Sequence, residues 1–517
     1  MRRISIALFF YSSIAFSQTP TWSNKIAKII YSNCTECHRS GGIAPFSLLS
    51  YADAQAQAFG IKSATSSKMM PPWHADPSYN HLKGERILTS QQISDISDWV
   101  NAGAPAGDLS QAPLPPTFTP GIKMQNPDKS FSIPTYSVVK NTDDYRCFVI
   151  PSGITASKFL SQIEFEPMNI SIVHHILLFQ DNAITCKNLD DADPLPGYAS
   201  FGGGIGSGTS TLIGGWVPGG NLIDIPQNMG ILLKANSYLI LQIHYAPGSL
   251  SKKDSTRCHF KYTSLTNTRE IFVVPILNHA NGGNGGITNG PLFIPANTVK
   301  KFNQVYTLDN TTDYSIISVA PHLHLIGKSY KVFAVTPVND TLKLCNIPDW
   351  DFHWQGAYTF RKIVKFPKST KVYGEAIYDN TANNPLNPSS PPKNVSLGEN
   401  TTDEMMLCYF TYTLYQAGDE NIILDSSVLQ PSGIIPIKEN GRCTIYPNPV
   451  QNSLTIHLMG NYDHVIIAIM DIQGKEMIRQ TATGNYIPVD ISSIPQGVYV
   501  IKIFQGENET SKRFVKH

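Results

Sequence analysis

Residues 170–179 read ISIVHHILLF, a short apolar run with β-branched side chains that is interrupted by the adjacent His174 and His175. Three further runs of this kind are YLILQIHY (238–245), REIFVVPIL (269–277) and YSIISVAPHLHL (314–325). Clusters of Gly, Asn and Pro separate the runs, a pattern that is typical of the strands of β-sandwiches. We therefore predict an all-β region that runs to about Leu429.

The pattern upstream of this β region is helical. Apolar residues share one helix face around Ile30, and a second helix begins where Thr89 and Gln92 have the spacing of a capping box, with Gly103 placed to end it. A Pro-rich stretch, QAPLPPTFTPG, then begins a stiff linker, predicted over residues 111–128. We predict a small all-α domain over residues 18–110.

The chain opens with MRRISIALFFYSSIAFSQ, in which two arginines precede an apolar run and a small-x-small pattern ends at Ser17. This arrangement predicts a signal peptide over residues 1–17, although a buried helix could give a similar run. No other stretch reaches the roughly 18 apolar residues that a membrane span needs. We expect an exported protein with no transmembrane span.

The composition excludes some classes of partner. The chain has 517 residues, which favours several domains, and 40 Lys and Arg against 39 Asp and Glu. A net charge of +1 without long charged runs gives no support for nucleic-acid binding. The Gly-rich residues 201–220 lack the Lys-Ser/Thr ending of a phosphate-binding loop, so we expect a surface loop there.

Residues 34–38, CTECH, fit the C-x-x-C-H pattern in which Cys34 and Cys37 attach haem covalently and His38 binds its iron. A thioredoxin-type redox pair would need a βαβ context, and half a zinc site would need a second pair of ligands nearby. Met69 and Met70, in MMPPW, are both candidates for the second axial ligand.

Residues 21–108 resemble a class of small cytochrome c domains that is marked by CxxCH, MPPW and a closing helix ending in GAPxGD. The resemblance implies that Met70 is the second ligand of a c-type haem. Such a haem suits electron transfer more than dioxygen binding.

Histidines recur in the β region. His322 and His324 are two residues apart, so on a strand they would face the same side and could hold one metal ion. His174 and His175 are adjacent, so both can bind one ion only if the strand twists or bulges there. Imidazoles together with the thioether of Met405 favour copper and redox chemistry.

Four motifs, VHHILLF, LQIHY, HLHLIG and TTDEMM, are similar in order and form to VHHMLLF, LQVHY, HTHHLG and SSDEM of the copper type II, ascorbate-dependent monooxygenases. This is the family of peptidylglycine α-hydroxylating monooxygenase and dopamine β-monooxygenase. The likeness covers residues 144–415 and implies two all-β sandwiches, over residues 129–265 and 266–429, with one copper ion each. The implied ligands of the electron-supplying copper are His174, His175 and His244, and those of the dioxygen-activating copper are His322, His324 and Met405.

The same resemblance implies a disulfide between Cys147 and Cys258. Six cysteines lie outside CTECH, and by themselves they allow fifteen pairings. Two other family cysteines, which form a second disulfide, are replaced by Ala376 and Met406. Cys345 and Cys408 are candidates to form a bridge in its place, and the sequence leaves open whether they meet.

The substrate site departs from the family pattern. The family member that acts on peptides binds a terminal carboxylate through an Arg, an Asn and a Tyr, and the corresponding residues here are Ala320, Leu407 and Tyr409. Without the guanidinium, a charge-assisted bidentate contact to a carboxylate is lost. We therefore expect a different small molecule or peptide, with Tyr409 retained in the catalytic set beside Met405, His322 and His324.

The C-terminal residues 443–517, after a linker over 430–442, contain CTIYPNPVQNSLTIHL, IMDIQGKEM and IPQGVYVIKI. They resemble the type IX secretion sorting domain, which implies a small β-sandwich that engages the type IX machinery and delivers the protein to the cell surface or the medium. A generic immunoglobulin-like module is the alternative.

Together these features predict an exported monooxygenase that hydroxylates a C–H bond with dioxygen and two copper ions. Its electron donor would be ascorbate, an external cytochrome or the haem carried on the same chain, whose tethering raises its effective concentration. A non-catalytic electron-transfer or copper-binding protein is the main alternative, and an adhesin is a weaker one.

Overall fold

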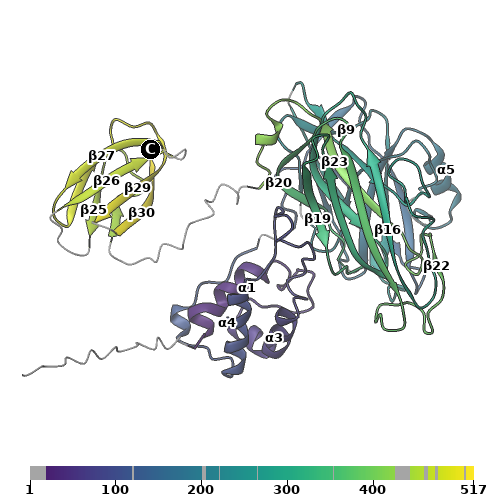
Figure 1. The fold of residues 1–517 in the computed structure, drawn as a ribbon, viewed down its shortest axis with the longest axis horizontal. Coiled ribbons are helices and arrows are strands. Elements are labelled where there is room, and N and C mark those ends of the chain that lie inside the picture. Colours follow the sequence, from purple (N-terminus) through teal and green to yellow (C-terminus); the bar gives the residue numbers. More distant parts are fainter. Residues whose placement is uncertain are drawn as a thin grey trace, which may run out of the picture. The chain divides into compact units, whose positions relative to one another are not determined.

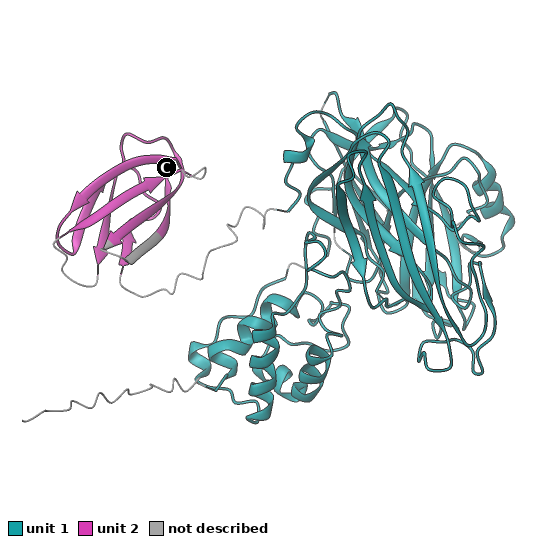
Figure 2. Ribbon diagram, in the orientation of Figure 1, with its two compact units in different colours: residues 1–425 teal, residues 426–517 magenta. Residues whose placement is uncertain are grey.

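The structure is a computed structural model that describes residues 19–118, 121–200, 205–220, 222–264, 266–352, 354–425, 443–458, 464–471, 475–505 and 508–517. The predicted signal peptide and the predicted linker over residues 430–442 lie outside these ranges. The chain divides into two compact units, residues 1–425 and residues 426–517 (Figure 2).

The helices near the start of the chain pack around two indoles, Trp22 and Trp99, whose ring centroids are 6.4 Å apart. Figure 1 shows α1, α3 and α4 grouped together. The predicted capping box is confirmed, because Thr89 and Gln92 exchange side-chain hydrogen bonds at the start of α4, and Gly103 follows its end with φ +85°. The helical elements are η1 Trp22–Ile26, α1 Ala27–Asn33, α2 Tyr51–Ala56, α3 Ala58–Ser66, α4 Ser90–Asn101, η2 Leu109–Gln111, α5 Thr185–Ala192 and η3 Asp419–Asn421.

The first part of the β region has two main sheets, in the orders β6-β3-β10-β5-β7 and β1-β12-β4-β9-β13, with β8 paired to β4. Leu178 and Leu241 of the first sheet share a buried apolar core with Leu160 and Ile163 of the second. The strands are β1 Lys129–Ser132, β2 Tyr136–Ser137, β3 Asp144–Pro151, β4 Lys158–Glu166, β5 Val173–Asp181, β6 Tyr198–Ala199, β7 Thr211–Trp216, β8 Ile223–Asp224, β9 Met229–Leu233, β10 Tyr238–Tyr245, β11 Lys253–Asp254, β12 Arg257–Tyr262 and β13 Arg269–Glu270.

The second part has two further sheets, in the orders β14-β23-β17-β20 and β16-β21-β18-β19. Phe410 of the first sheet and Phe302 and Tyr330 of the second are fully buried in one core. The strands are β14 Phe272–Leu277, β15 Phe293–Ile294, β16 Thr298–Thr307, β17 Tyr314–His322, β18 Gly327–Val335, β19 Thr341–Ile347, β20 Tyr358–Phe366, β21 Lys371–Asn380, β22 Val395–Ser396 and β23 Leu407–Leu414.

The predicted fold class, which begins with a separate small all-α cytochrome c domain, is wrong. The chain is 40% strand and 12% helix, and its β structure is divided among many small sheets. The helices belong to the same compact unit as the β region. Between α3 and α4, Leu82 forms a β-bridge with Phe360 of β20, and both Leu82 and Ala75 are buried in the core of the second pair of sheets. Residues 73–86 therefore contribute to a β core, and the helices do not form a compact unit separate from the β region.

The predicted pairing of Cys147 with Cys258 is also wrong, because all eight cysteines are free thiols in this structure. Cys147 on β3 is buried in a cluster that contains Cys186. Cys258 lies on β12, in the other sheet, and is buried in the core between the two sheets. Cys345 and Cys408 are buried in one core, that of the second pair of sheets.

The C-terminal unit has two sheets, in the orders β24-β25-β28 and β27-β26-β29-β30. Ile456, Ile467 and Ile501 are fully buried between them. The strands are β24 Cys443–Tyr446, β25 Ser453–Leu458, β26 Val465–Met470, β27 Glu476–Ala482, β28 Tyr486–Asp490, β29 Gly497–Gln505 and β30 Asn508–Lys516. Throughout the described ranges, no helix has the length and apolar character needed to cross a membrane.

Candidate copper centres

The first histidine set is built by two neighbouring antiparallel strands, β5 and β10. His175 lies opposite His244, but the register shifts at the next position, so that Tyr245 faces Val173 and His174 is the extra residue. The predicted bulge is therefore confirmed. It brings both imidazoles of β5 to His244, with ring centroids 4.8 Å from His174 and 4.9 Å from His175.

The ring nitrogens of this set are placed to bind one metal ion. One ligand atom from each of His174, His175 and His244 lies within 4.8 Å of the others, and the Nδ1 atoms of His174 and His175 are 3.3 Å apart. His244 Nε2 lies 2.7 Å from the Asp143 carboxylate and donates its proton there. The Nδ1 lone pair of His244 is consequently buried without a hydrogen-bond partner, which fits a metal ligand whose tautomer a carboxylate holds.

Burial also favours the form of these imidazoles that binds metal. The pKa of His175 lies well below its usual range because the ring is buried and because the neighbouring imidazoles of His244 and His174 oppose a second charge. Only the neutral ring has a free lone pair, so the site is prepared for a cation. Tyr145 stacks on His244 with ring centroids 4.1 Å apart and fixes the plane of that ring.

The second set lies at the end of β17. His322 is the last residue of the strand and His324 lies just beyond it, so the two do not share a strand face as predicted, but their ring centroids are 5.1 Å apart. His322 Nδ1 donates to Gln355 Oε1 over 2.6 Å, and His324 Nδ1 donates to the Asp403 carbonyl over 3.1 Å. These bonds leave both Nε2 lone pairs for a metal ion.

Burial lowers the pKa of His322 to about 3 and that of His324 to about 4, and the neighbouring imidazoles add to the effect. At neutral pH both rings are therefore uncharged in the folded chain.

We expect the copper-free protein to lose stability as the pH falls from about 6.5 toward about 4. Below pH 6.5 the unfolded chain protonates His322 and His324, whereas the folded chain does not until the pH reaches about 4 and then about 3. Urea unfolding across this range measures the slope, and a His322→Gln/His324→Gln chain should have a shallower one. An equal slope in both chains would contradict the assignment.

Met405 is held beside the second set by a buried carboxylate. Glu404 Oε2 accepts the backbone N–H groups of His324 at 2.9 Å and Met405 at 3.2 Å, and Oε1 accepts that of Ile326 at 2.9 Å. The Tyr378 hydroxyl donates to the Met405 carbonyl at 2.7 Å. Burial raises the pKa of Glu404 to about 8, although the N–H bonds lower it. One side chain thus joins the turn after β17 to the segment that contains the thioether.

Replacing Glu404 with alanine should lower the free energy of unfolding by roughly 3 kcal/mol or more, because three buried N–H groups lose their acceptor. The same change should weaken copper binding at the second set and spare the first. Chemical unfolding and copper titration measure the two effects. A Glu375→Ala control removes a half-exposed carboxylate that pairs with Lys301, and should cost within about 0.5 kcal/mol. If Glu404→Ala behaves like this control, the carboxylate does not hold the site.

A phenyl ring connects the two sets. Phe352 stacks on His174 with centroids 5.2 Å apart and meets His324 edge-on at 5.8 Å. Asp143, which orients His244, also accepts a hydrogen bond from Thr401 at 3.0 Å, shortly before Met405 in the chain. The structure therefore brings all the predicted metal ligands into one region of the first unit.

Several residues of this region were not predicted from the sequence. Glu404 lies inside the motif TTDEMM, and Asp143 lies just before residue 144, where the family likeness begins, so a search for carboxylates near the predicted motifs would have found both. Phe352 and Gln355 lie in the connection from β19 to β20, where no local pattern points to a metal site.

Tyr409 lies on β23, directly opposite Ala320 of β17, and Leu407 lies opposite His322. Ala320, Leu407 and Tyr409 occupy the family's carboxylate-binding positions. They are thus neighbours on two paired strands beside the second histidine set. Burial raises the pKa of the Tyr409 phenol to about 12, so the group is a protonated hydrogen-bond donor at neutral pH.

The CTECH residues follow the end of α1. Cys34 and Cys37 are half-buried free thiols, and the His38 backbone N–H donates to the Cys34 carbonyl at 2.9 Å, which continues the helical turn. His38 Nδ1 lies 3.2 Å from the Phe46 carbonyl and donates to it, so Nε2 is available for a haem iron. Met70, beyond α3, is 38% exposed, whereas Met69 is 64% exposed. The thiols and the free imidazole nitrogen fit a covalent haem.

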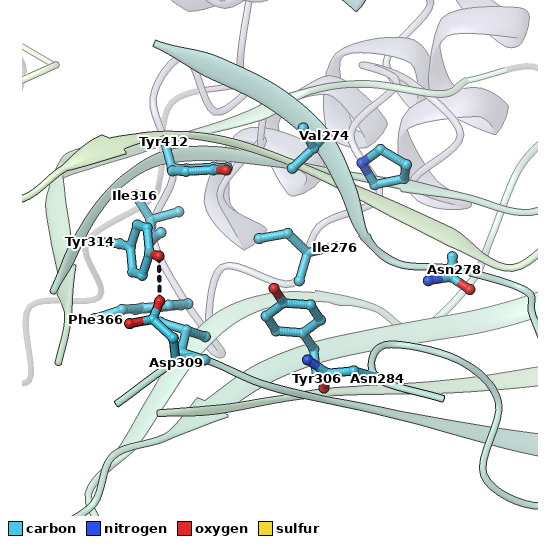
Figure 3. A pocket seen from close by; sticks show the side chains of 12 residues that line it. Val274, Ile276, Asn278, Asn284, Tyr306, Asp309, Tyr314, Ile316, Phe366 and Tyr412 are labelled. Atoms are coloured by element: carbon cyan, nitrogen blue, oxygen red, sulfur yellow. Dashed lines mark hydrogen bonds between the residues drawn. The ribbon is translucent and has the colours of Figure 1, made fainter. Parts of the chain in front are cut away.

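A cavity of about 250 Å³ lies elsewhere in the second pair of sheets, and its lining includes Tyr306, Tyr314 and Tyr412 (Figure 3). The Tyr314 hydroxyl donates to Asp309 across it. Tyr314 begins β17 and His322 ends it, so about 26 Å of extended strand separates Tyr314 from the second histidine set.

The C-terminal unit matches a known family along nearly its whole length. Residues 444–517 match the family described as the secretion system C-terminal sorting domain. This unit is a sorting domain. It marks the chain for export through the type IX machinery to the cell surface or beyond. No curated protein matched the chain.

Solved structures resemble the chain only distantly. PNGase F, a glycosylasparaginase from Flavobacterium meningosepticum, is 11% identical with a TM-score of 0.25, and the match covers 55% of this chain and 96% of that one. Bacteroides uniformis β-glucuronidase 3 is 10% identical with a TM-score of 0.13, over 44% of this chain and 27% of that one. The match therefore spans about a quarter of the glucuronidase, and TM-scores this low support no inference about function.

Proposed function

We propose that this chain is an exported copper-dependent monooxygenase that hydroxylates a C–H bond with dioxygen. The observation that supports it most is the pair of histidine sets, each with oriented imidazoles and ring nitrogens left for a metal ion. The order of the four motifs resembles that of the copper type II, ascorbate-dependent monooxygenases. When bound, copper would supply the redox chemistry: dioxygen activation at His322, His324 and Met405, and a second electron from His174, His175 and His244.

The residues around the ligands have defined tasks in this proposal. Asp143 and Gln355 hold His244 and His322 in the tautomers that leave a ring nitrogen for copper. Glu404 fixes the distance between the His324 turn and Met405. Tyr409 is a hydrogen-bond donor on the strand position opposite the substituted Ala320, and orients the substrate. Because Ala320 offers no cation, we propose a substrate without a terminal carboxylate, either a small molecule or a peptide.

We further propose that a c-type haem, attached at Cys34 and Cys37 with His38 and Met70 as axial ligands, supplies electrons to the copper region. Ascorbate or an external cytochrome is the alternative donor. The haem motif and the copper ligands belong to the same compact unit, which supports a donor on the same chain.

The test is a copper-loaded chain incubated with reductant, dioxygen and a library of metabolites and peptides, scored for products heavier by one oxygen atom. Metal analysis should give about two copper ions per chain. A His259→Ala chain controls for the loss of a buried histidine outside the two sets, because His259 is buried against Ser130 and Glu166. It should bind the same amount of copper as the parent chain. Copper binding without any oxygenated product would favour a non-catalytic electron-transfer or copper-binding protein.

A further inference from the structure

The connection from β19 to β20 is in contact with both histidine sets. Its Phe352 lies between His174 and His324, and its Gln355 bonds His322. The connection is anchored by Trp350, whose backbone N–H donates to the Lys328 carbonyl at 2.9 Å and whose indole is buried in the second core. Trp354 lies between Phe352 and Gln355 in the chain, so a group that contacts Trp354 is within two residues of side chains that contact the candidate copper ligands.

Trp354, the residue before Gln355, contacts the segment between α3 and α4. The Arg86 guanidinium lies over the Trp354 ring, with Cζ 5.8 Å from the centroid. A Cβ atom added at Gly219 would lie 3.1 Å from this indole, so glycine there permits the close approach. Arg86 Nη2 also lies 3.4 Å from the Gly219 carbonyl.

The same arginine reaches the CTECH motif. Arg86 Nη1 lies 4.0 Å from Cys37 Sγ, one of the two sulfur atoms that a covalent haem would use. A single side chain thus spans from a thiol of the haem motif to the indole beside the copper ligands.

The position of Arg86 is fixed by its neighbours. The preceding Glu85 accepts the Leu82 backbone N–H at 2.6 Å and pairs with Arg361 of β20 at 3.2 Å. Leu82 itself bridges to Phe360 on the same strand. Arg86 therefore leaves a segment that is joined to the β core.

We propose that Arg86 and Trp354 form the electron-transfer contact between a haem at Cys37 and the copper ligands reached through Gln355 and Phe352. This inference rests on the proposed function. The step moves one electron: ferrous haem becomes ferric, Cu(II) becomes Cu(I), and no bond or proton is transferred. The alternative role for this pair is a structural cation–π contact, which is worth roughly 0.5–2 kcal/mol.

The experiment is flash photoreduction of the haem in the full chain loaded with Cu(II), under argon. Decay of the ferrous haem band and loss of the Cu(II) paramagnetic signal report transfer without turnover or substrate. In Trp354→Leu and Arg86→Gln chains, the decay should slow by about tenfold or more, equivalent to about 1.4 kcal/mol of barrier. Reduction of the copper by ascorbate should be unchanged in both.

Arg39→Gln is the matched control. Arg39 is also an arginine beside the haem motif, but its guanidinium lies over Phe118, 4.4 Å from the ring centroid, and not over Trp354. This variant should transfer at the parent rate, and Trp354→Phe, which keeps an aromatic ring, should slow less than Trp354→Leu. The copper signal before the flash checks that each variant retains its metal sites.

Equal decay rates in the parent, Trp354→Leu and Arg86→Gln chains would overturn the proposal and leave the pair a structural contact. Ferrous haem that persists in a parent chain with a normal Cu(II) signal would overturn it as well, and the monooxygenase proposal would stand. A parent chain that binds no copper would instead remove the proposed function itself.

Discussion

Replacing Met405 with leucine should reduce hydroxylation by about 100-fold or more, while the first copper ion remains bound. Leucine keeps nearly the same volume, so the change removes the thioether and little else. Met405 is 6% exposed, and hydrogen bonds with Glu404 and Tyr378 fix its backbone. We therefore expect no other sulfur atom to take the position of its thioether in the variant. Loss of residues that only support metal ligands already costs 10–100-fold in many enzymes.

Met406→Leu is the control for this experiment, because Met406 is a neighbouring methionine that is fully buried in the second core. It should leave product formation unchanged. X-ray absorption at the copper edge should show a copper–sulfur distance that disappears in Met405→Leu and persists in Met406→Leu. Full activity in Met405→Leu would contradict the assignment of the dioxygen-activating site.

The second large effect is expected at the CTECH motif. A Cys34→Ala/Cys37→Ala chain should lose its haem absorbance completely, because both covalent attachments are removed. Copper content should remain at about two ions, since the histidine sets do not contact either thiol. Turnover supported by ascorbate should survive, whereas turnover supported by a cytochrome reductant should be lost.

Cys443→Ala is the matched control for the double variant, since Cys443 is a buried free thiol in the sorting domain. It should keep the full haem spectrum. Retention of haem in the Cys34→Ala/Cys37→Ala chain would show that the haem is bound elsewhere, and an absence of haem from the parent would remove the electron-donor proposal.

Local patterns predicted the local features well. The capping box at Thr89 and the bulge at His174 each depend on interactions within a few residues, or on the geometric need for adjacent histidines to face one metal. The prediction of a separate helical domain was wrong because it depended on contacts between residues far apart in the sequence. Nothing near Leu82 in the sequence shows that its partner is Phe360, because that bridge depends on the packing of a strand more than 250 residues later.

The candidate site divides in the same way. The ligands His174, His175, His244, His322, His324 and Met405 all lie in recognisable motifs. The groups that orient them come from elsewhere: Gln355 and Phe352 are contributed by a connection whose sequence has no metal-binding pattern. The Cys147–Cys258 pairing, which the family resemblance implied, failed because Cys147 is buried in a cluster with Cys186, whereas Cys258 is buried in the core between the two sheets. A strand pattern indicates burial, but not which buried residues meet.

The shared segment between α3 and α4 also constrains the order of events when the chain is made and exported. If the chain crosses the inner membrane starting from its N-terminus, residues 73–86 leave the cytoplasm early. Ala75 and Leu82 can be buried in their core only after β20 has also been exported. Contacts so distant in sequence form slowly, because a long loop must close first. During that interval CTECH is presented on an unfinished fold, where it would be accessible to an enzyme that attaches the proposed haem. The same delay leaves an apolar segment uncovered, so chaperone protection during export should matter more for this chain than for one with an independent N-terminal domain.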